Sequence, residues 1–344
     1  MFGFWKKGSE ALTAPFFGAL LVATAFWAFV AWDQSNWWRV KEDYSFGWLV
    51  PLFVAFVIYD RWAKIVAGVK ACAAPDSPRA NGLARWLLGG LVAGGLLFGL
   101  LAFLLGALLR AGQGVSQPAT IALAVGAAAI VLSLFFLNAP APGSAAAAPT
   151  PRIGVLGDAR VQLVSLFVFP VLVWLISAPL VSAVEVEVST FLLGKVVAVV
   201  SFVFDVLGLP IEQHGNVLSL PNGSSVGVED ACSGIRSLTG CLFAGSFLAA
   251  VFLDRLWKKV ALVAAAMVLA FITNLMRGLF LTSWAYNYGS KSVEGTVHDT
   301  AGYAVLGLTV IGLLCLLPLF NLKFVSHADD PAEGAPPSPP DARD

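Results

Sequence analysis

Apolar residues in this chain form long blocks separated by short polar segments, and only one short stretch alternates in polarity. A helix needs about 20 mainly apolar residues to cross a bilayer. Blocks of this kind lie at residues 11–32, 46–59, 86–109, 118–137, 161–184, 233–253, 260–281 and 300–320. The second block is short and contains Pro51, so it either crosses the membrane or packs inside the bundle. The pattern predicts an all-α polytopic membrane protein with about eight transmembrane helices.

Composition supports the same class. Hydrophobic residues make up 58% and charged residues 12% of the 344 residues, against roughly 25% charged in soluble domains. The mean hydropathy is +0.82. The 21 basic and 21 acidic residues balance, so nothing indicates a nucleic-acid partner. No metal-ligand spacing is present, and we expect neither a metal nor a cofactor.

The basic residues predict how the chain crosses the lipid bilayer. With the N-terminus in the cytoplasm, eight spans also leave the C-terminus there, and most of the 21 basic residues then fall on the cytoplasmic side, as the positive-inside rule requires. These residues are Lys6, Lys7, Arg61, Lys64, Lys70, Arg79, Arg85, Arg152, Arg160, Arg255, Lys258, Lys259, Lys323 and Arg343.

A further apolar stretch at residues 190–209 carries Lys195 and Asp205. If it crossed the membrane, the basic loop at residues 254–259 would face outward, against the positive-inside rule. We therefore predict an amphipathic helix on the outer interface between transmembrane helices five and six.

The outer segment between the fifth and sixth helices also contains a hairpin pattern. Residues 217–220 and 226–228 alternate in polarity around Pro221, Asn222, Gly223 and Ser224, and Asn-Gly is a strong hairpin signal. We predict a short extracytoplasmic β-hairpin that leads the chain back to the membrane surface.

Composition also suggests a division of the chain. Residues 1–138 form an N-terminal half of four membrane helices, and residues 139–160 form a Pro/Ala-rich cytoplasmic linker. Residues 161–320 form a C-terminal half that holds every candidate for catalysis. Residues 321–344 are acidic and rich in proline, which predicts a disordered cytoplasmic tail.

Cys232 is the cysteine expected at the outer face. Cys72 falls in a cytoplasmic segment, while Cys241 and Cys315 lie inside apolar blocks, where cysteine usually acts as a small hydrophobe. A lone thiol in an oxidising compartment is a liability unless it is used. The alternative is a cysteine that merely ends a loop.

The neighbours of Cys232 suit a nucleophile. It begins the sixth apolar block, where free backbone N–H groups favour a thiolate, and Arg236 follows one turn later. Glu229 and Asp230 oppose the thiolate if they face the sulfur, or they hold a histidine or an arginine in place.

Two further stretches supply reactive side chains. Arg277 lies deep in the seventh block, on one helical face with Asn274, which favours a cavity or a partner over snorkelling to the headgroups. His298 precedes the eighth block on the same side of the membrane, and histidine exchanges protons near neutral pH. His214, near the hairpin, is the competing histidine, but it lies in a loop.

The stretches EDACSGIRSL, NLMRG and VHDTAGY, in this order and each beside a membrane helix, resemble the exosortase/archaeosortase family of membrane-embedded cysteine transpeptidases. EDYSFGWLVPL resembles an early stretch of the same family, with Phe46 where members commonly show histidine. That departure suggests that the early histidine is dispensable or has a different role here. The resemblance covers the early stretch and nearly all of residues 161–320.

The resemblance implies that Cys232 is the nucleophile, that His298 carries the proton and that Arg277 stabilises the oxyanion or the thiolate. It implies substrates that are exported proteins with a C-terminal sorting signal: a Pro-Glu-Pro type motif, a transmembrane helix and a basic cluster. It also implies a multi-pass protein of the bacterial inner membrane with its active site on the extracytoplasmic face. The acceptor nucleophile stays open.

Two other classes of function compete with this hypothesis. A transporter should carry broken helices with ionisable groups near the midplane, whereas here those groups gather near one face. A non-catalytic membrane component of a polysaccharide or protein export assembly would tolerate loss of Cys232. Labelling with a membrane-impermeant thiol reagent separates these classes, because an enzyme should show one accessible and reactive site.

Overall fold

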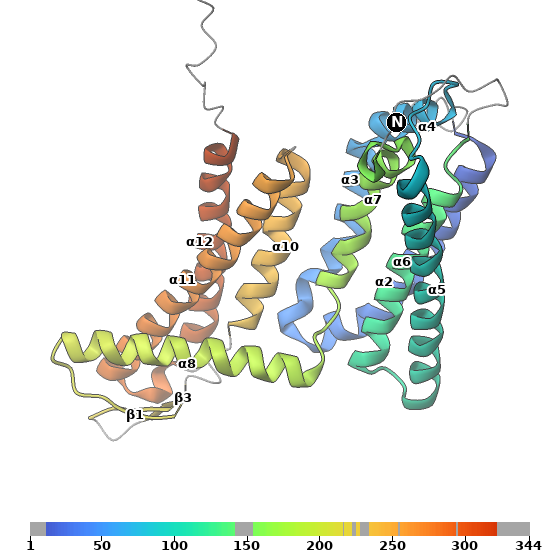
Figure 1. Cartoon of the computed structure of the whole chain (residues 1–344). Helices are drawn as coiled ribbons and strands as arrows, with labels where there is room; N and C mark the ends of the chain where they lie inside the picture. Colours follow the sequence, from blue (N-terminus) through green and yellow to red (C-terminus); the bar gives the residue numbers. More distant parts are fainter. Residues whose placement is uncertain are drawn as a thin grey trace, which may run out of the picture.

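The computed structural model describes residues 12–141, 154–215, 217–221, 225–227, 234–253, 255–293 and 295–321. Ten α-helices make up most of this part of the chain (Figure 1). They are α2 (Ala14–Val40), α3 (Val50–Asp60), α4 (Trp62–Ala73), α5 (Gly82–Gln113), α6 (Gln117–Leu137), α7 (Ala159–Ile176), α8 (Ser182–Val206), α10 (Ile235–Phe252), α11 (Leu256–Tyr288) and α12 (Thr296–Asn321). Short 3-10 helices lie at η1 (Glu42–Leu49), η2 (Val155–Gly157) and η3 (Ser290–Val293).

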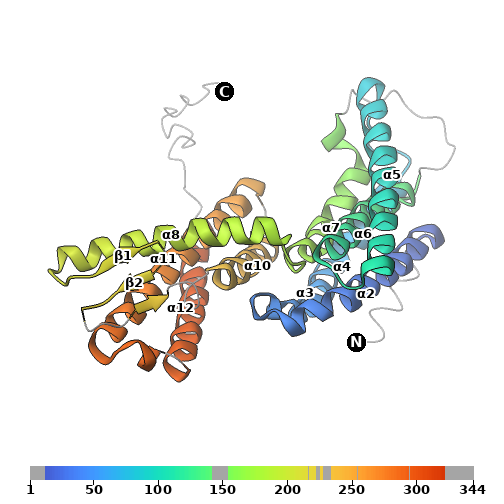
Figure 2. The ribbon, with the colours of Figure 1, turned by 90° about the horizontal axis from the view of Figure 1, so that it is seen from below.

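The all-α polytopic class predicted from the sequence is confirmed. Within the described residues, nine helical segments are long and apolar enough to cross a membrane, and eight of them coincide with the predicted spans. The short second span is η1 and α3 together, Glu42–Asp60. The ninth segment is α8, which lies crosswise to the other long helices in both views (Figures 1 and 2). Its direction fits the predicted interfacial helix.

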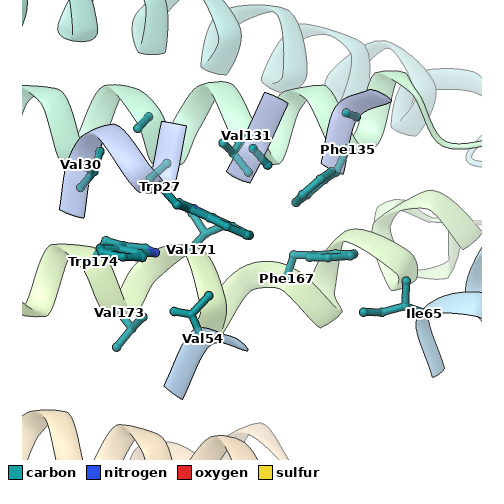
Figure 3. Packing of buried hydrophobic residues seen from close by; sticks show 14 of the residues in the cluster. Trp27, Val30, Val54, Ile65, Val131, Phe135, Phe167, Val171, Val173 and Trp174 are labelled. Carbon is teal, nitrogen blue, oxygen red and sulfur yellow. The ribbon is translucent and has the colours of Figure 1, made fainter. Parts of the chain in front are cut away.

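A first group of helices shares one hydrophobic core. Side chains from α2, α3, α4, α6 and α7 meet there, and Figure 3 shows the rings of Trp27, Phe135, Phe167 and Trp174 among aliphatic side chains of the same core. Phe135 and Phe167 are fully buried, with ring centroids 4.3 Å apart. Burial of aromatic rings of this size supplies much of the free energy that holds such a core together.

Helix α7 follows the proposed linker but packs into this first core through Leu163, Phe167 and Val171. Most of residues 139–160 lie outside the described residues, as does the proposed tail. The division of the chain into two halves therefore stays a prediction.

A second group consists of α10, α11 and α12, with α8 across one end (Figure 1). Val196 and Val200 of α8 are fully buried in a core that also contains Leu281 of α11. Gly278 permits this close packing, since a Cβ atom there would lie 2.8 Å from Cγ1 of Val196. The contact fixes α8 against the part of α11 that carries Arg277.

The predicted hairpin is confirmed, with one strand more than expected. Strands β2 (Val217–Ser219) and β3 (Ser225–Gly227) pair antiparallel, and Leu218 lies opposite Val226. Strand β1 (Glu212–His214) pairs with the other edge of β2. Leu218 is fully buried and belongs to the α8 core, so the sheet is fixed to the same end of the molecule as α8.

Several contacts join the groups at this end. The Lys41 ammonium forms an ion pair of 2.6 Å with Glu185 at the start of α8. Phe46 of η1 stacks on Phe243 of α10, with ring centroids 5.1 Å apart. The early motif that contains Phe46 thus packs directly against the helix that follows Cys232 in the sequence.

Candidate functional site

Arg277 and His298 meet across the contact between α11 and α12. Nη2 of Arg277 lies 3.0 Å from Nε2 of His298. A guanidinium can only donate hydrogen bonds, so Nε2 of His298 is the acceptor and the imidazole is neutral in this arrangement. The proton is then on Nδ1, which faces Oδ1 of Asp299 at 3.4 Å.

The packing of α11 on α12 sets this geometry. The hydroxyl groups of Thr273 on α11 and Thr309 on α12 lie 3.0 Å apart and are buried. Arg277 follows Thr273 by one helical turn, and its guanidinium lies over the first turn of α12, near Gly302. The structure differs from the prediction in one detail: α12 begins at Thr296, so His298 is inside the helix. The first turn of α12 adds the positive end of a helix dipole to the site.

Arg277 has spare donor capacity. Its Nε atom is buried, and no described residue accepts a hydrogen bond from it. Buried polar atoms are normally satisfied, and an arginine at this depth normally has a partner or a cavity. The guanidinium could therefore donate to an anionic oxygen without breaking its bond to His298.

Asn274 connects this pair to the segment that contains the candidate nucleophile. It is buried on α11, three residues before Arg277. Asn274 also lies against Gly234, because a Cβ atom at Gly234 would be 3.1 Å from Nδ2 of Asn274. Gly234 is the N-cap of α10 and has φ of +71°, a conformation that only glycine adopts readily.

Cys232, Glu229 and Asp230 lie outside the described residues. Helix α10 begins at Ile235 with Gly234 as its N-cap, and the expected position of Cys232 falls outside the described residues.

Arg236 does not face the Arg277 and His298 pair. Its guanidinium forms an ion pair with Glu42 and a second one of 3.6 Å with Asp43. Next to it, the Thr239 hydroxyl donates to the backbone carbonyl of Asp43 at 3.0 Å. Arg236 therefore holds η1 against α10, and sequence reasoning missed its two partners although both belong to the early motif.

The remaining candidates are spread over the molecule. His214 is on β1, 70% exposed, and its one ion-pair partner among the described residues is Glu212 at 3.4 Å. Cys72 and Cys241 are buried, and Cys315 is exposed on α12. Burial raises the pKa of the Cys72 thiol, which disfavours the thiolate. No group of three or more potential metal ligands is found among the described residues.

A groove of about 430 Å³ lies between α11 and α12, and Arg277 is among the residues that line it. Its walls are Met276, Phe280 and Trp284 of α11 and Ala304, Val305 and Leu308 of α12. Met276, Phe280 and Leu308 are each more than 40% exposed. The groove is thus largely apolar and partly open at the surface, and Arg277 is the charged residue in its lining.

Comparison with known proteins identifies the family. Residues 37–315 match the protein family described as transmembrane exosortase. Searches of curated proteins and of solved structures gave no match. The matched range includes η1 with the early motif and extends into α12, so it holds both elements of the Arg277 and His298 pair. Because it spans most of the chain, the chain belongs to the transmembrane exosortase family.

Proposed function

We propose that this protein is a cysteine protease and transpeptidase that cleaves the C-terminal sorting signal of exported proteins and transfers them to an acceptor nucleophile. Membership in the exosortase family supports a membrane-embedded sorting transpeptidase in general. The observation that carries the finer assignment is the contact of 3.0 Å between Arg277 and His298 beside the N-terminus of α10.

Cys232 precedes Gly234 by two residues in the sequence and itself lies outside the described residues. Gly234 contacts Asn274, which is on the same face of α11 as Arg277. This contact supports the proposal that Cys232 acts together with Arg277 and His298.

The proposed chemistry assigns one role to each side chain. His298 accepts the proton of the Cys232 thiol, and the thiolate attacks the carbonyl carbon of the scissile peptide bond. Arg277 donates to the oxyanion that forms, through the donor capacity described above. His298 then returns the proton to the leaving amine, which leaves a thioester on Cys232. An acceptor nucleophile attacks the thioester, and the thiolate is released.

The apolar groove supports a substrate that is itself a membrane helix. A helix lying along Phe280 and Leu308 would exchange lipid contacts for protein contacts and would present one end at Arg277. This fits a sorting signal in which a Pro-Glu-Pro type motif precedes a transmembrane helix and a basic cluster. On the predicted orientation, the reaction takes place on the extracytoplasmic face of the bacterial inner membrane.

Substitution of Cys232 tests the proposal. Cells that express the Cys232→Ala or Cys232→Ser variant with a reporter carrying the sorting signal should accumulate the uncleaved reporter. Cys315→Ala is the matched control, because Cys315 is exposed on α12 and distant in sequence from the site, and it should process the reporter normally. Normal processing by Cys232→Ala would exclude the proposed nucleophile.

A further inference from the structure

Three aromatic side chains lie on one face of α11 between Arg277 and the end of the helix. Phe280, Trp284 and Tyr288 follow each other at intervals of four residues, so they are neighbours on the helix surface. The ring centroids of Phe280 and Trp284 are 5.7 Å apart, and those of Trp284 and Tyr288 are 4.8 Å apart. We call these three residues the aromatic row. The proposed sorting chemistry gives Trp284 and Tyr288 no role.

The aromatic row extends the groove toward the end of α11. Phe280 and Trp284 line the groove, and Tyr288 is the last residue of the helix. Phe280 is 46% and Tyr288 67% exposed, so their rings can contact a ligand. On the opposite wall, Thr296 and Thr300 of α12 are both exposed. This part of the groove thus offers aromatic rings on one side and hydroxyl groups on the other.

The aromatic row is at the end of the molecule where α8 and the sheet lie (Figure 1). Tyr286, near the end of α11, contacts Phe204 of α8 with ring centroids 5.9 Å apart. On the predicted orientation this is the extracytoplasmic end. A substrate helix in the remainder of the groove, along Val305 and Leu308, would therefore place the residues that precede it beside the aromatic row.

The spacing of the rings indicates which peptide fits them. Four residues of an α-helix rise about 6 Å, which separates Trp284 from Tyr288 along the axis of α11. In an extended chain, side chains i and i+2 point to the same face and lie about 6.6 Å apart. Each of these two side chains would thus meet one ring. Proline suits both positions, because its fixed φ favours an extended chain and because proline-rich segments dock into aromatic-lined grooves.

Exposed aromatic residues also occur in membrane proteins because their rings favour the headgroup region. Trp86 on α5 and Trp257 on α11 are examples in this chain, each more than 60% exposed and outside the groove. The aromatic row differs from them in that its rings contact one another along a groove whose lining includes Arg277. Ring contacts of this kind form a continuous surface for a peptide.

We propose that Trp284 and Tyr288 form two proline subsites, which bind a Pro-x-Pro segment in an extended conformation just before the membrane helix of the substrate. This inference rests on the proposed function and names the residues that select the sorting signal. The two prolines lie on the rings, and the middle residue points away from them, toward the α12 wall with Thr296 and Thr300. A Pro-Glu-Pro type motif has this pattern.

Binding of fluorescent peptides to the purified full chain tests the proposal. The parent peptide carries the Pro-Glu-Pro motif, an apolar helix and a basic cluster, and the Cys232→Ala variant is used so that the peptide is not consumed. Replacing both prolines by alanine should raise Kd about tenfold, as loss of contacting groups does. Moving the second proline one residue further should have the same effect, because it then points to the opposite face.

Protein variants in the same Cys232→Ala background locate the subsites. Trp284→Leu should raise Kd for the parent peptide about tenfold, and the alanine peptide should then bind no more weakly than the parent, because the contact is already lost. Tyr288→Leu changes an exposed position at the end of α11, so the fold should be retained, and it should show the same coupling. Trp86→Leu is the matched control and should discriminate between the peptides as the unchanged background does.

Equal affinity for the parent and the shifted-proline peptide would overturn the proline subsites, as would an alanine effect of the same size in Trp284→Leu and Trp86→Leu. The aromatic row would then be part of an interfacial aromatic belt, and binding of the parent peptide would leave the proposed function standing. Failure of the parent peptide to bind would contradict both the subsites and the proposed function.

Discussion

The Nη2 atom of Arg277 donates a hydrogen bond of 3.0 Å to Nε2 of His298, so this ring nitrogen already has a partner. One nitrogen of the guanidinium thus fixes the tautomer and the orientation of the imidazole, while Nε has no hydrogen-bond acceptor among the described residues. We infer that the pair works as a unit, in which Arg277 orients the imidazole of His298 through Nη2 and can donate to an oxyanion through Nε.

Replacement of His298 tests this unit. His298→Gln keeps a side-chain oxygen that can accept from Arg277, so the fold should be retained, but the proton carrier is lost. We expect the rate of reporter cleavage to fall by roughly 10²–10⁴-fold. His214→Gln, on the exposed strand β1, should change the rate by less than about twofold. Equal effects of the two substitutions would contradict the assignment.

The same unit predicts how two losses combine. Arg277→Gln alone should reduce cleavage by roughly 10²–10³-fold, as loss of one oxyanion donor does. The double variant Arg277→Gln with His298→Gln should lose little more than the worse single variant, because groups that act together are not additive. Strictly additive losses in free energy would show that the two residues act independently.

Gly234 should be required for activity beyond its conformational role. Gly234→Ala forces a left-handed conformation that costs about 1–2 kcal/mol and places a methyl group against Asn274. Gly208 has the same φ of +71° with nothing within 4 Å of its Cβ position, so Gly208→Ala reproduces the strain alone. We expect similar thermal stability for both variants and a loss of roughly 10- to 100-fold in cleavage for Gly234→Ala only.

The groove next to Arg277 should govern substrate binding. Ala304→Trp fills it from α12, and we expect KM to rise about tenfold with little change in kcat, because binding is weakened equally in the ground and transition states. Leu314→Trp places the same ring on a part of α12 that is half exposed and outside the groove. Kinetics with detergent-solubilised substrate should show no change for this control.

Asp158 should make stability depend on pH at the acidic end. The carboxyl is buried at the N-terminus of α7. Burial raises its pKa, but hydrogen bonds from the Arg160 side chain and from the backbone N–H groups of Ala80 and Arg160 outweigh burial and leave the pKa below the ordinary value of 3.8. Such a group stabilises the fold above pH 3.8, and this contribution is lost as the pH falls through the lower folded-state value.

The matching variant is Asp158→Asn. It should lower the free energy of unfolding at pH 7 by about 1–3 kcal/mol, and the difference from the wild type should shrink below pH 4. Thermal unfolding in detergent at pH 7 and at pH 3 measures both quantities. A difference that is constant with pH would show that the carboxylate charge contributes nothing.

The sequence alone predicts the spans well, because a bilayer requires about 20 apolar residues for each crossing helix. It also predicts the hairpin from Asn222-Gly223, while the interfacial position of α8 stays a prediction. The ends of the helices are harder to predict from the sequence. Helix α11 continues to Tyr288, beyond the predicted end at residue 281, because Trp284 and Tyr288 remain favourable in a helix at the membrane surface.

The parts of the site that depend on pairing between distant segments could not be predicted. Arg236 follows Cys232 closely in the sequence, yet its partners are Glu42 and Asp43. Phe46 and Phe53 both stack on Phe243. An apolar stack of this kind accommodates the phenylalanine at position 46. The pattern of residues within one segment does not predict its contacts with a distant segment.

The most direct test of the account is the mass of the enzyme during turnover. After brief reaction with a substrate that carries the sorting signal, in the absence of an added acceptor, the wild-type protein should carry the substrate fragment as a hydroxylamine-sensitive thioester. Peptide mapping should place it on Cys232, and the Cys232→Ala variant should carry none. An adduct on another residue, or cleavage of the substrate by Cys232→Ala, would contradict the account.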